Sequence, residues 1–422
     1  MPTSRTRRAR RPGPDRQRAR RRRDRAERLA RSMHELPPEQ QALVDELDGF
    51  ERSGDAAGAR RMFEREGGLP SSPAAILDLL EVARLEDVGC APSWVYDRWV
   101  ARQAQRWLPR DPAGRLAPAL DQTAFAVPPT EAPGPGEDFG AYARRAVDGY
   151  YANWLANQIG VFELGGLGAF LAARAVPALT DRARGVRRWV EAPWGVYVAG
   201  HLTAGALEVR DLHTHTSTRV VHLGMASEVP VDQAWLGRIV AVDDDPGHLF
   251  ESPPLPIDET TARTLADGDL SVPRVLAVLR DAVDLGRLPR GFAAREATDL
   301  SCELGRRSPF GFGEQPTADF LAETSPGDAE AVAELVPLGV GELELDAILT
   351  FDTIGRMLGT SPQAPAGLTP LLVPPIVEAS PFEALRRHRT GPRHAEVWRH
   401  VHHHTPTFAK PRSRALLDAC AD

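Results

Sequence analysis

The stretch that decides the fold class is WGVYVAGHLTAGALEVRDLHTHTSTRVVHLG at 194–224. Apolar and polar residues alternate in it with a period of two, which is the spacing of side chains on one face of a β-strand. Turn-forming segments at 203–205 and 215–217 interrupt the alternation. We therefore predict antiparallel strands at 194–202, 204–212 and 218–224.

Apolar segments on either side of this stretch predict further strands at 186–190, 235–242 and 248–257. Five or six short strands at such spacing favour a small closed antiparallel β-barrel or a strongly bent sheet over 186–258, because closure removes exposed strand edges. The strand-period residues are expected to face one core; they are Val196, Val198, Leu207, Val209, Val220, Ile239 and Ala241.

Outside this segment the apolar residues recur at helical spacing. A helical domain is predicted over 36–185, with a Pro-rich linker or wrapping segment at 109–137 and helices at 139–160 and 164–175. A helical C-terminal region is predicted over 259–422, with a Pro-rich linker near 361–381. The predicted fold class is α+β: mostly helical, with one small antiparallel β-barrel or bent sheet in the middle.

Near the N-terminus, EQQALVDELDGFERS and AAGARRMFERE read as two antiparallel helices, with Asp55 capping the second. The phrase SGDAAGARRMFE resembles the turn and second helix of a tetratricopeptide unit. The resemblance covers one hairpin, since no 34-residue repeat follows. The aromatic residues farther along are expected to pack between helices; they are Trp94, Tyr96, Trp99 and Trp107.

The first thirty-two residues contain fourteen arginines and three acidic residues, a balance of +11, whereas the whole chain carries −7. The remainder therefore carries −18. Such an arm at 1–35 is expected to stay disordered until an anionic partner neutralises it. Contact with nucleic acid or another polyanion is predicted for Arg18, Arg20, Arg21, Arg22, Arg23 and Arg25.

Two alternatives stand beside this interpretation of the arm. The arm can lie on the chain's own acidic body instead of on a partner. The sequence MHELPPEQQALVDEL from Met33 also looks like a natural translation start, so 1–32 can be an artefact of an open upstream frame.

Lys410 is the one lysine of the chain, and the other fifty basic residues are arginine, a bias typical of a GC-rich genome. It lies in FAKPRSR, outside any P-loop, kinase or Schiff-base context, which argues against all three enzyme classes. Cys90, Cys302 and Cys420 are far apart, and no secretory signal or membrane span is recognised. We expect a soluble, cytoplasmic protein without disulfides or cofactors and with no membrane partner.

Histidines supply the candidate metal ligands. Asp211, His213 and His215 in DLHTHTST could share one face of a strand, although a solvated hairpin tip explains them as well. On a helix, His400, His403 and His404 in HAEVWRHVHHH would fall on one side. No H-E-x-x-H motif is present, so no catalytic residue is assigned.

The order GVFELGGLGAFLAARAVPALTDRARGVRRWVEAPWGVYVAG, followed by LGRIVAV and HLFESPPLPI, resembles uncharacterised actinobacterial proteins, some of which carry a SEC-C motif. The resemblance covers about residues 160–258 and is loose, and the chain lacks that motif. It implies a helix-plus-small-barrel module and no activity.

These observations favour a non-enzymatic scaffold or regulatory protein. It would bind protein partners through its helical surfaces and nucleic acid through its arm. The alternative is a metal-dependent hydrolase that uses histidines of the β segment.

Overall fold

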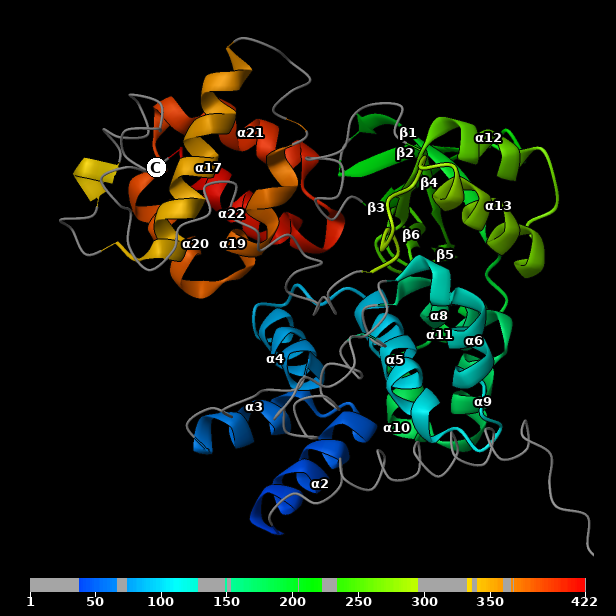
Figure 1. The fold of residues 1–422 in the computed structure, drawn as a ribbon. Helices are drawn as coiled ribbons and strands as arrows, with labels where there is room; N and C mark the ends of the chain where they lie inside the picture. Colours follow the sequence, from blue (N-terminus) through cyan, green and yellow to red (C-terminus); the bar gives the residue numbers. More distant parts are fainter. Residues whose placement is uncertain are drawn as a thin grey trace, which may run out of the picture.

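The computed structural model describes residues 38–66, 74–127, 149, 153–203, 205–221, 234–294, 332–335, 340–359, 366 and 368–421. It confirms an α+β fold that is mostly helical, with antiparallel strands in the middle of the chain (Figure 1). The arm at 1–35, with the six arginines predicted to contact nucleic acid, lies outside the described residues, as do most of 139–152 and 295–331.

Helices form the N-terminal part of the chain, as predicted. They are α2 (Pro38–Ser53), α3 (Ala56–Arg65), α4 (Ala74–Asp87), α5 (Trp94–Trp107), η1 (Leu108–Arg110), α6 (Leu116–Thr123), η2 (Ala124–Ala126), α8 (Trp154–Gln158), η3 (Ile159–Glu163), α9 (Gly166–Ala173), α10 (Pro177–Arg182) and α11 (Val186–Trp189).

The predicted helical hairpin is present as α2 and α3. Asp55 caps α3, because its Oδ1 accepts a hydrogen bond from the backbone N–H of Gly58 at 2.7 Å. Gly54 turns the chain with φ +71°, a conformation that glycine adopts without steric cost. Behind this hairpin, Trp94 and Trp99 on α5 are completely buried, which confirms their predicted place between helices.

In the described residues seven strands follow: β1 (Gly195–Thr203), β2 (Ala206–Asp211), β3 (Ser217–Val221), β4 (Ala234–Gly237), β5 (Ile239–Ala241), β6 (His248–Phe250) and β7 (Leu255–Ile257). Five of them form an antiparallel sheet in the order β3-β2-β1-β4-β7, and β5 pairs with β6 in a separate two-stranded sheet. The closed barrel is therefore wrong, and the sheet is open. The predicted strand at 235–242 is divided at Arg238 between the two sheets.

Both faces of the five-stranded sheet are buried, which corrects the expectation of one common core. Val196 and Leu236 face α12 (Glu259–Ala266) and α13 (Val272–Asp284). Leu207 and Val209 face Phe250 of the small sheet, together with Tyr197. The sheet thus lies between a helical layer and the small sheet. The residues predicted to face one core are divided between its two sides, with Val196 and Val198 on one and Leu207, Val209 and Val220 on the other.

Two other local predictions are corrected. Residues 186–190, predicted as a strand, form α11, because Val186 and Trp189 are also spaced to share one buried helical face. The segment at 109–137, predicted as irregular, contains α6, in which Pro118 occupies a position near the helix start where its missing N–H costs no bond.

The C-terminal region is helical, as predicted (orange to red in Figure 1). It contains α17 (Glu342–Leu358), η6 (Thr369–Leu372), α19 (Val373–Val377), α20 (Ala379–His388), η7 (Pro392–His394), α21 (Ala395–His404), η8 (Thr407–Ala409) and α22 (Lys410–Asp418). The Pro-rich linker expected near 361–381 is instead helical and largely buried from Thr369 onward, because its prolines lie in the first turns of short helices.

One apolar core joins the described N-terminal helices to the C-terminal helices. It runs from α3 through α5 to the C-terminal helices. At this junction the Trp94 ring meets the Phe408 ring edge-on at 6.1 Å, and Arg84 forms an ion pair with Glu378. The described N-terminal and C-terminal helices therefore share one packed core, which also contains side chains of the small sheet.

Candidate functional site

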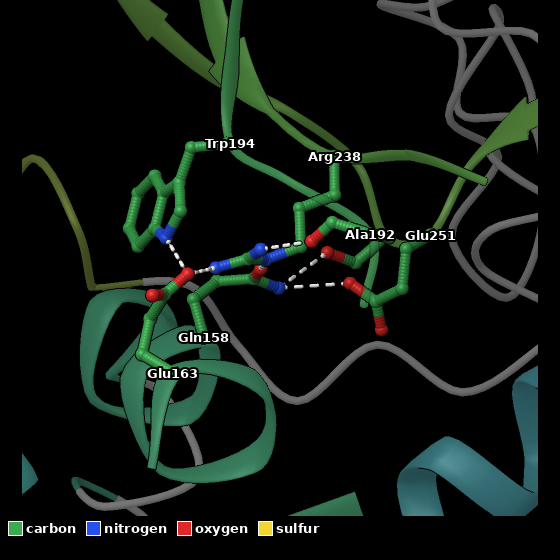
Figure 2. Close-up of polar contacts among 7 residues, drawn as sticks. Gln158, Glu163, Ala192, Trp194, Arg238 and Glu251 are labelled. Carbon is green, nitrogen blue, oxygen red and sulfur yellow. Dashed lines mark hydrogen bonds and ion pairs between the residues drawn. The ribbon is translucent and has the colours of Figure 1, made fainter. Parts of the chain in front are cut away.

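The most concentrated group of buried polar side chains surrounds Arg238, between β4 and β5 (Figure 2). Its side chain is 1% exposed. The Nε donates to the Gln158 side-chain oxygen at 2.9 Å, and the other guanidinium nitrogens donate to the Ala192 carbonyl and to the Glu163 carboxylate. The guanidinium therefore joins three segments that are far apart in the sequence.

A π-helical turn presents two of these partners. In η3 the backbone N–H of Leu164 donates to the carbonyl of Ile159 at 2.8 Å, one residue further back than in an α-helix. This wider turn follows Gln158 directly and ends at Glu163. It requires glycine beside it, since a Cβ on Gly166 would lie 2.4 Å from the carbonyl oxygen of Gly160.

Aromatic rings enclose the guanidinium. Its central carbon lies 4.8 Å from the ring centres of both Phe162 and Trp194, in cation–π geometry. The indole N–H of Trp194 donates to Glu163, the carboxylate that also pairs with Arg238 (Figure 2). The Trp194 ring therefore packs on the guanidinium while its N–H binds the partner of that guanidinium.

A second carboxylate completes the group. Glu251 accepts from the Gln158 amide at 2.8 Å, and its backbone N–H donates to the Arg238 carbonyl at 2.9 Å. Burial lowers the pKa of Arg238, while the carboxylates of Glu163 and Glu251 act to raise it. Arginine stays charged nonetheless, since its ordinary pKa is far above neutrality. Through these hydrogen bonds and this ion pair, the group fixes the five-stranded sheet to the π-helical turn.

Asp97 on α5 is a separate buried carboxyl group. It accepts a hydrogen bond from the backbone N–H of Gly185 at 3.0 Å, just before α11. Burial raises its pKa to about 7, although the N–H groups of Val186 and Gly185 and the charge of Arg188 act in the opposite direction. This carboxyl group therefore titrates near neutral pH.

The predicted metal candidates lie at the β2–β3 turn. The Asp211 Oδ1 accepts from the backbone N–H groups of His213 at 2.7 Å and Thr214 at 3.0 Å, so the carboxylate closes the turn. The His213 ring contacts the Ala266 carbonyl at 2.9 Å, and His215 is exposed with φ 58°. Across the part of the chain that the structure describes, no group of three or more His, Cys, Asp or Glu side chains is arranged to hold a metal ion.

The three histidines expected on one side of a helix do lie together on α21. The ring centres of His400 and His404 are 4.5 Å apart, and those of His403 and His404 are 4.8 Å apart. Burial, with a smaller effect from the charges of His400 and His403, lowers the pKa of His404 from 6.5 to about 4. The histidine of this helix that faces α22 is His402, whose Nδ1 lies 3.0 Å from the Ser413 hydroxyl.

Sequence reasoning missed Arg238 and Asp97. A charged residue inside an apolar stretch was the available signal, in WLGRIVAV and in WVYDRWV. Strand and helix periodicity also permit those charges to face water, so the pattern alone does not reveal their burial.

Within the described residues no single helix is both long and apolar enough to cross a membrane; α8 with η3 passes that test only together with α9, as a pair bent by 58°. Comparisons with protein-family models, curated proteins and solved structures found no match to this chain. The function is therefore inferred from the chain's own residues.

Proposed function

We propose that this chain is a non-enzymatic scaffold or regulatory protein of the cytoplasm whose N-terminal arm binds nucleic acid or another polyanion. The observation that carries the proposal is the division of charge: +11 over residues 1–32 against −18 over the remainder. Arginine forks suit phosphate oxygens, and neutralising several phosphates releases counterions, which gives strong binding at low salt.

The use of charge in the described part of the chain supports the scaffold interpretation. Arg238 joins the sheet to η3, and Arg389 binds both oxygens of Asp352 at 2.7 Å, joining α20 to α17. Buried ion pairs of this kind fix the relative positions of elements. The result is a rigid body on which helical surfaces can receive protein partners.

The arm is tested in the full chain by a sextuple variant in which Arg18, Arg20, Arg21, Arg22, Arg23 and Arg25 are each replaced with Gln. Fluorescence anisotropy with labelled duplex DNA should show a loss of affinity. The slope of log affinity against log salt should fall by up to about 5, at roughly 0.9 per phosphate contact. If the variant and the native chain bind equally well, the arm is not the polyanion site.

A metal-dependent hydrolase is the competing function. The Asp211 carboxylate that it would need already accepts two backbone hydrogen bonds in the β2–β3 turn. Metal analysis of untagged, chelator-washed protein discriminates between the two. Stoichiometric zinc that disappears in the His213→Ala, His215→Ala variant would replace the scaffold proposal with the hydrolase.

A further inference from the structure

The folded part of the chain has a basic region of its own at the C-terminal end. Residues 379–421 contain eight Arg or Lys against three Asp or Glu, a balance of +5, and six of the twelve histidines. Since the whole chain carries −7 and residues 1–32 carry +11, everything else carries −23. Residues 379–421 are therefore positively charged, whereas the rest of the chain without the arm is strongly negative.

Within this region, α21 and α22 pack side by side, which places His402 of α21 against α22 and near the charges of Lys410 and Arg414. Arg399 and His403 are one helical turn apart on α21 and exposed, and His402 lies beside them. Lys410 and Arg414 are one turn apart on α22. We call these five residues the α21–α22 basic surface.

The positive charges of this surface crowd one another. Burial lowers the pKa of His402, and the nearby charges of Lys410 and Arg414 lower it further. Asp418 is the acidic group acting on His402, and it already pairs with Arg414 at 2.8 Å. Lys410 also opens α22, where the positive end of the helix dipole disfavours a cation. A bound anion would relieve this repulsion.

The side chains around the surface favour a phosphate backbone as that anion. Among the described residues, the exposed large apolar side chains are Leu285 and Leu343, and neither lies on the surface. A membrane-surface helix would need such side chains to insert into lipid. Trp398 is fully buried and Phe408 packs against Trp94, so neither of these rings is offered for stacking on bases.

From this arrangement we propose that the α21–α22 basic surface is a second polyanion site, which binds the phosphate backbone of nucleic acid with little sequence preference. This proposal rests on the proposed function, from which it takes nucleic acid as the class of partner. It adds a second binding site, on the folded part of the chain. The arm and this surface would then hold one nucleic acid at two points.

The first experiment compares two full-chain variants of equal net charge. The surface variant carries Arg399→Gln, Lys410→Gln and Arg414→Gln. The control carries Arg110→Gln, Arg174→Gln and Arg263→Gln, three exposed arginines elsewhere in the described chain. With duplex DNA, the surface variant should lower the slope of log affinity against log salt by about 2 to 3, and the control by less than about 1. Melting followed by circular dichroism checks that both variants are folded.

The second experiment uses Lys410, the sole lysine of the chain, as a reporter. Duplex DNA should slow acylation of its amine several-fold at low salt, as read by mass spectrometry, and high salt should remove the protection. The sextuple arm variant should keep this protection, which separates failure of the arm from failure of the surface. Equal slopes for the surface and control variants, or an unprotected Lys410, would overturn the proposal. Protection by anionic phospholipid vesicles but not by DNA would overturn the choice of nucleic acid.

Discussion

Asp97 illustrates at the scale of one residue how the fold changes an ordinary side chain. Asp97 is 2% exposed, and burial raises the pKa of its carboxyl group from 3.8 to about 7. A raised carboxyl pKa means that the folded state holds the proton more tightly than the unfolded chain does. The contribution to stability is fully present below about pH 4 and is lost as pH rises through about 7.

The Asp97→Asn variant tests this linkage. Between about pH 4 and 7 the native chain should lose up to about 4 kcal/mol of unfolding free energy through this one group, at about 1.4 kcal/mol per pKa unit. Chemical denaturation at several pH values measures the difference between the two proteins. The difference should change steadily over that window and be constant above it; a difference independent of pH would contradict the raised pKa.

Arg238 is the second residue whose environment decides its role. Replacing it with Met would leave the buried Gln158 side-chain oxygen and the Ala192 carbonyl without their guanidinium donor, and Glu163 with only the Trp194 N–H. We expect a loss of about 3 to 5 kcal/mol in the free energy of unfolding, as for other buried ion pairs broken on one side. Denaturant titration measures it. The matched control is Arg263→Gln at an exposed ion pair with Glu259, which should change stability by no more than about 0.5 kcal/mol.

At the scale of the secondary-structure element, α3 shows a boundary that could be predicted from the sequence. The Ser53-Gly54-Asp55 turn was assigned from residue types, and the structure confirms that Asp55 caps the helix. Asp55→Ala should therefore cost about 1 kcal/mol, within a range of roughly 0.5 to 2. Asp55→Asn keeps an acceptor oxygen and should retain most of the stability in the same denaturation assay. Equal losses for both variants would contradict a capping role.

His402 gives α21 a response to pH. His402 faces the cations Lys410, Arg414 and His403 and the carboxylate of Asp418. Because burial and those cations lower its pKa from 6.5, its protonation requires acidic solution, and a bound phosphate would favour it. Affinity for duplex DNA should therefore rise as pH falls from about 8 to about 5.5.

The His402→Gln, His403→Gln variant should weaken that rise, as measured by anisotropy at constant ionic strength. The Arg110, Arg174 and Arg263 control variant should keep it in full. A pH response that is unchanged in the histidine variant would place its origin elsewhere in the chain.

At the scale of the whole molecule, the chief finding is that the two ends of the chain share one core. Phe408 of η8 packs on Trp94 of α5, and both belong to the cluster that runs from α3 to α22. Elements that share a core unfold together. Differential scanning calorimetry should therefore show the N-terminal and C-terminal helices melting in one transition.

Variants on the two sides of that core test the coupling. Trp398→Ala, in the C-terminal helices, and Leu85→Ala, in α4, both remove fully buried side chains. Each should cost about 2 to 5 kcal/mol and lower the same melting transition. Two separate transitions, each shifted by one variant only, would show that the ends of the chain are independent units.

The sequence by itself determined what depends on neighbouring residues. The change of period at 194–224 identified β1, β2 and β3, the turn residues placed the α2–α3 hairpin, and the arginine count separated arm from body. Periodicity is a local property, because backbone geometry repeats every two residues in a strand and every 3.6 in a helix. The α+β class followed from these signals alone.

Tertiary structure alone decided the features that depend on distant partners. Which strands become the edges depends on β1 pairing with β4, about forty residues later, and the sheet is open because its edge strands β3 and β7 do not pair. Alternation along β1 also does not reveal that both of its faces are covered. A short pattern such as VRRWV at 186–190 fits a strand or a helix, and packing on α5 selects the helix. The burial of Arg238 and Asp97, and the meeting of His402 with Lys410, arise because folding brings separate segments together and removes water from between them.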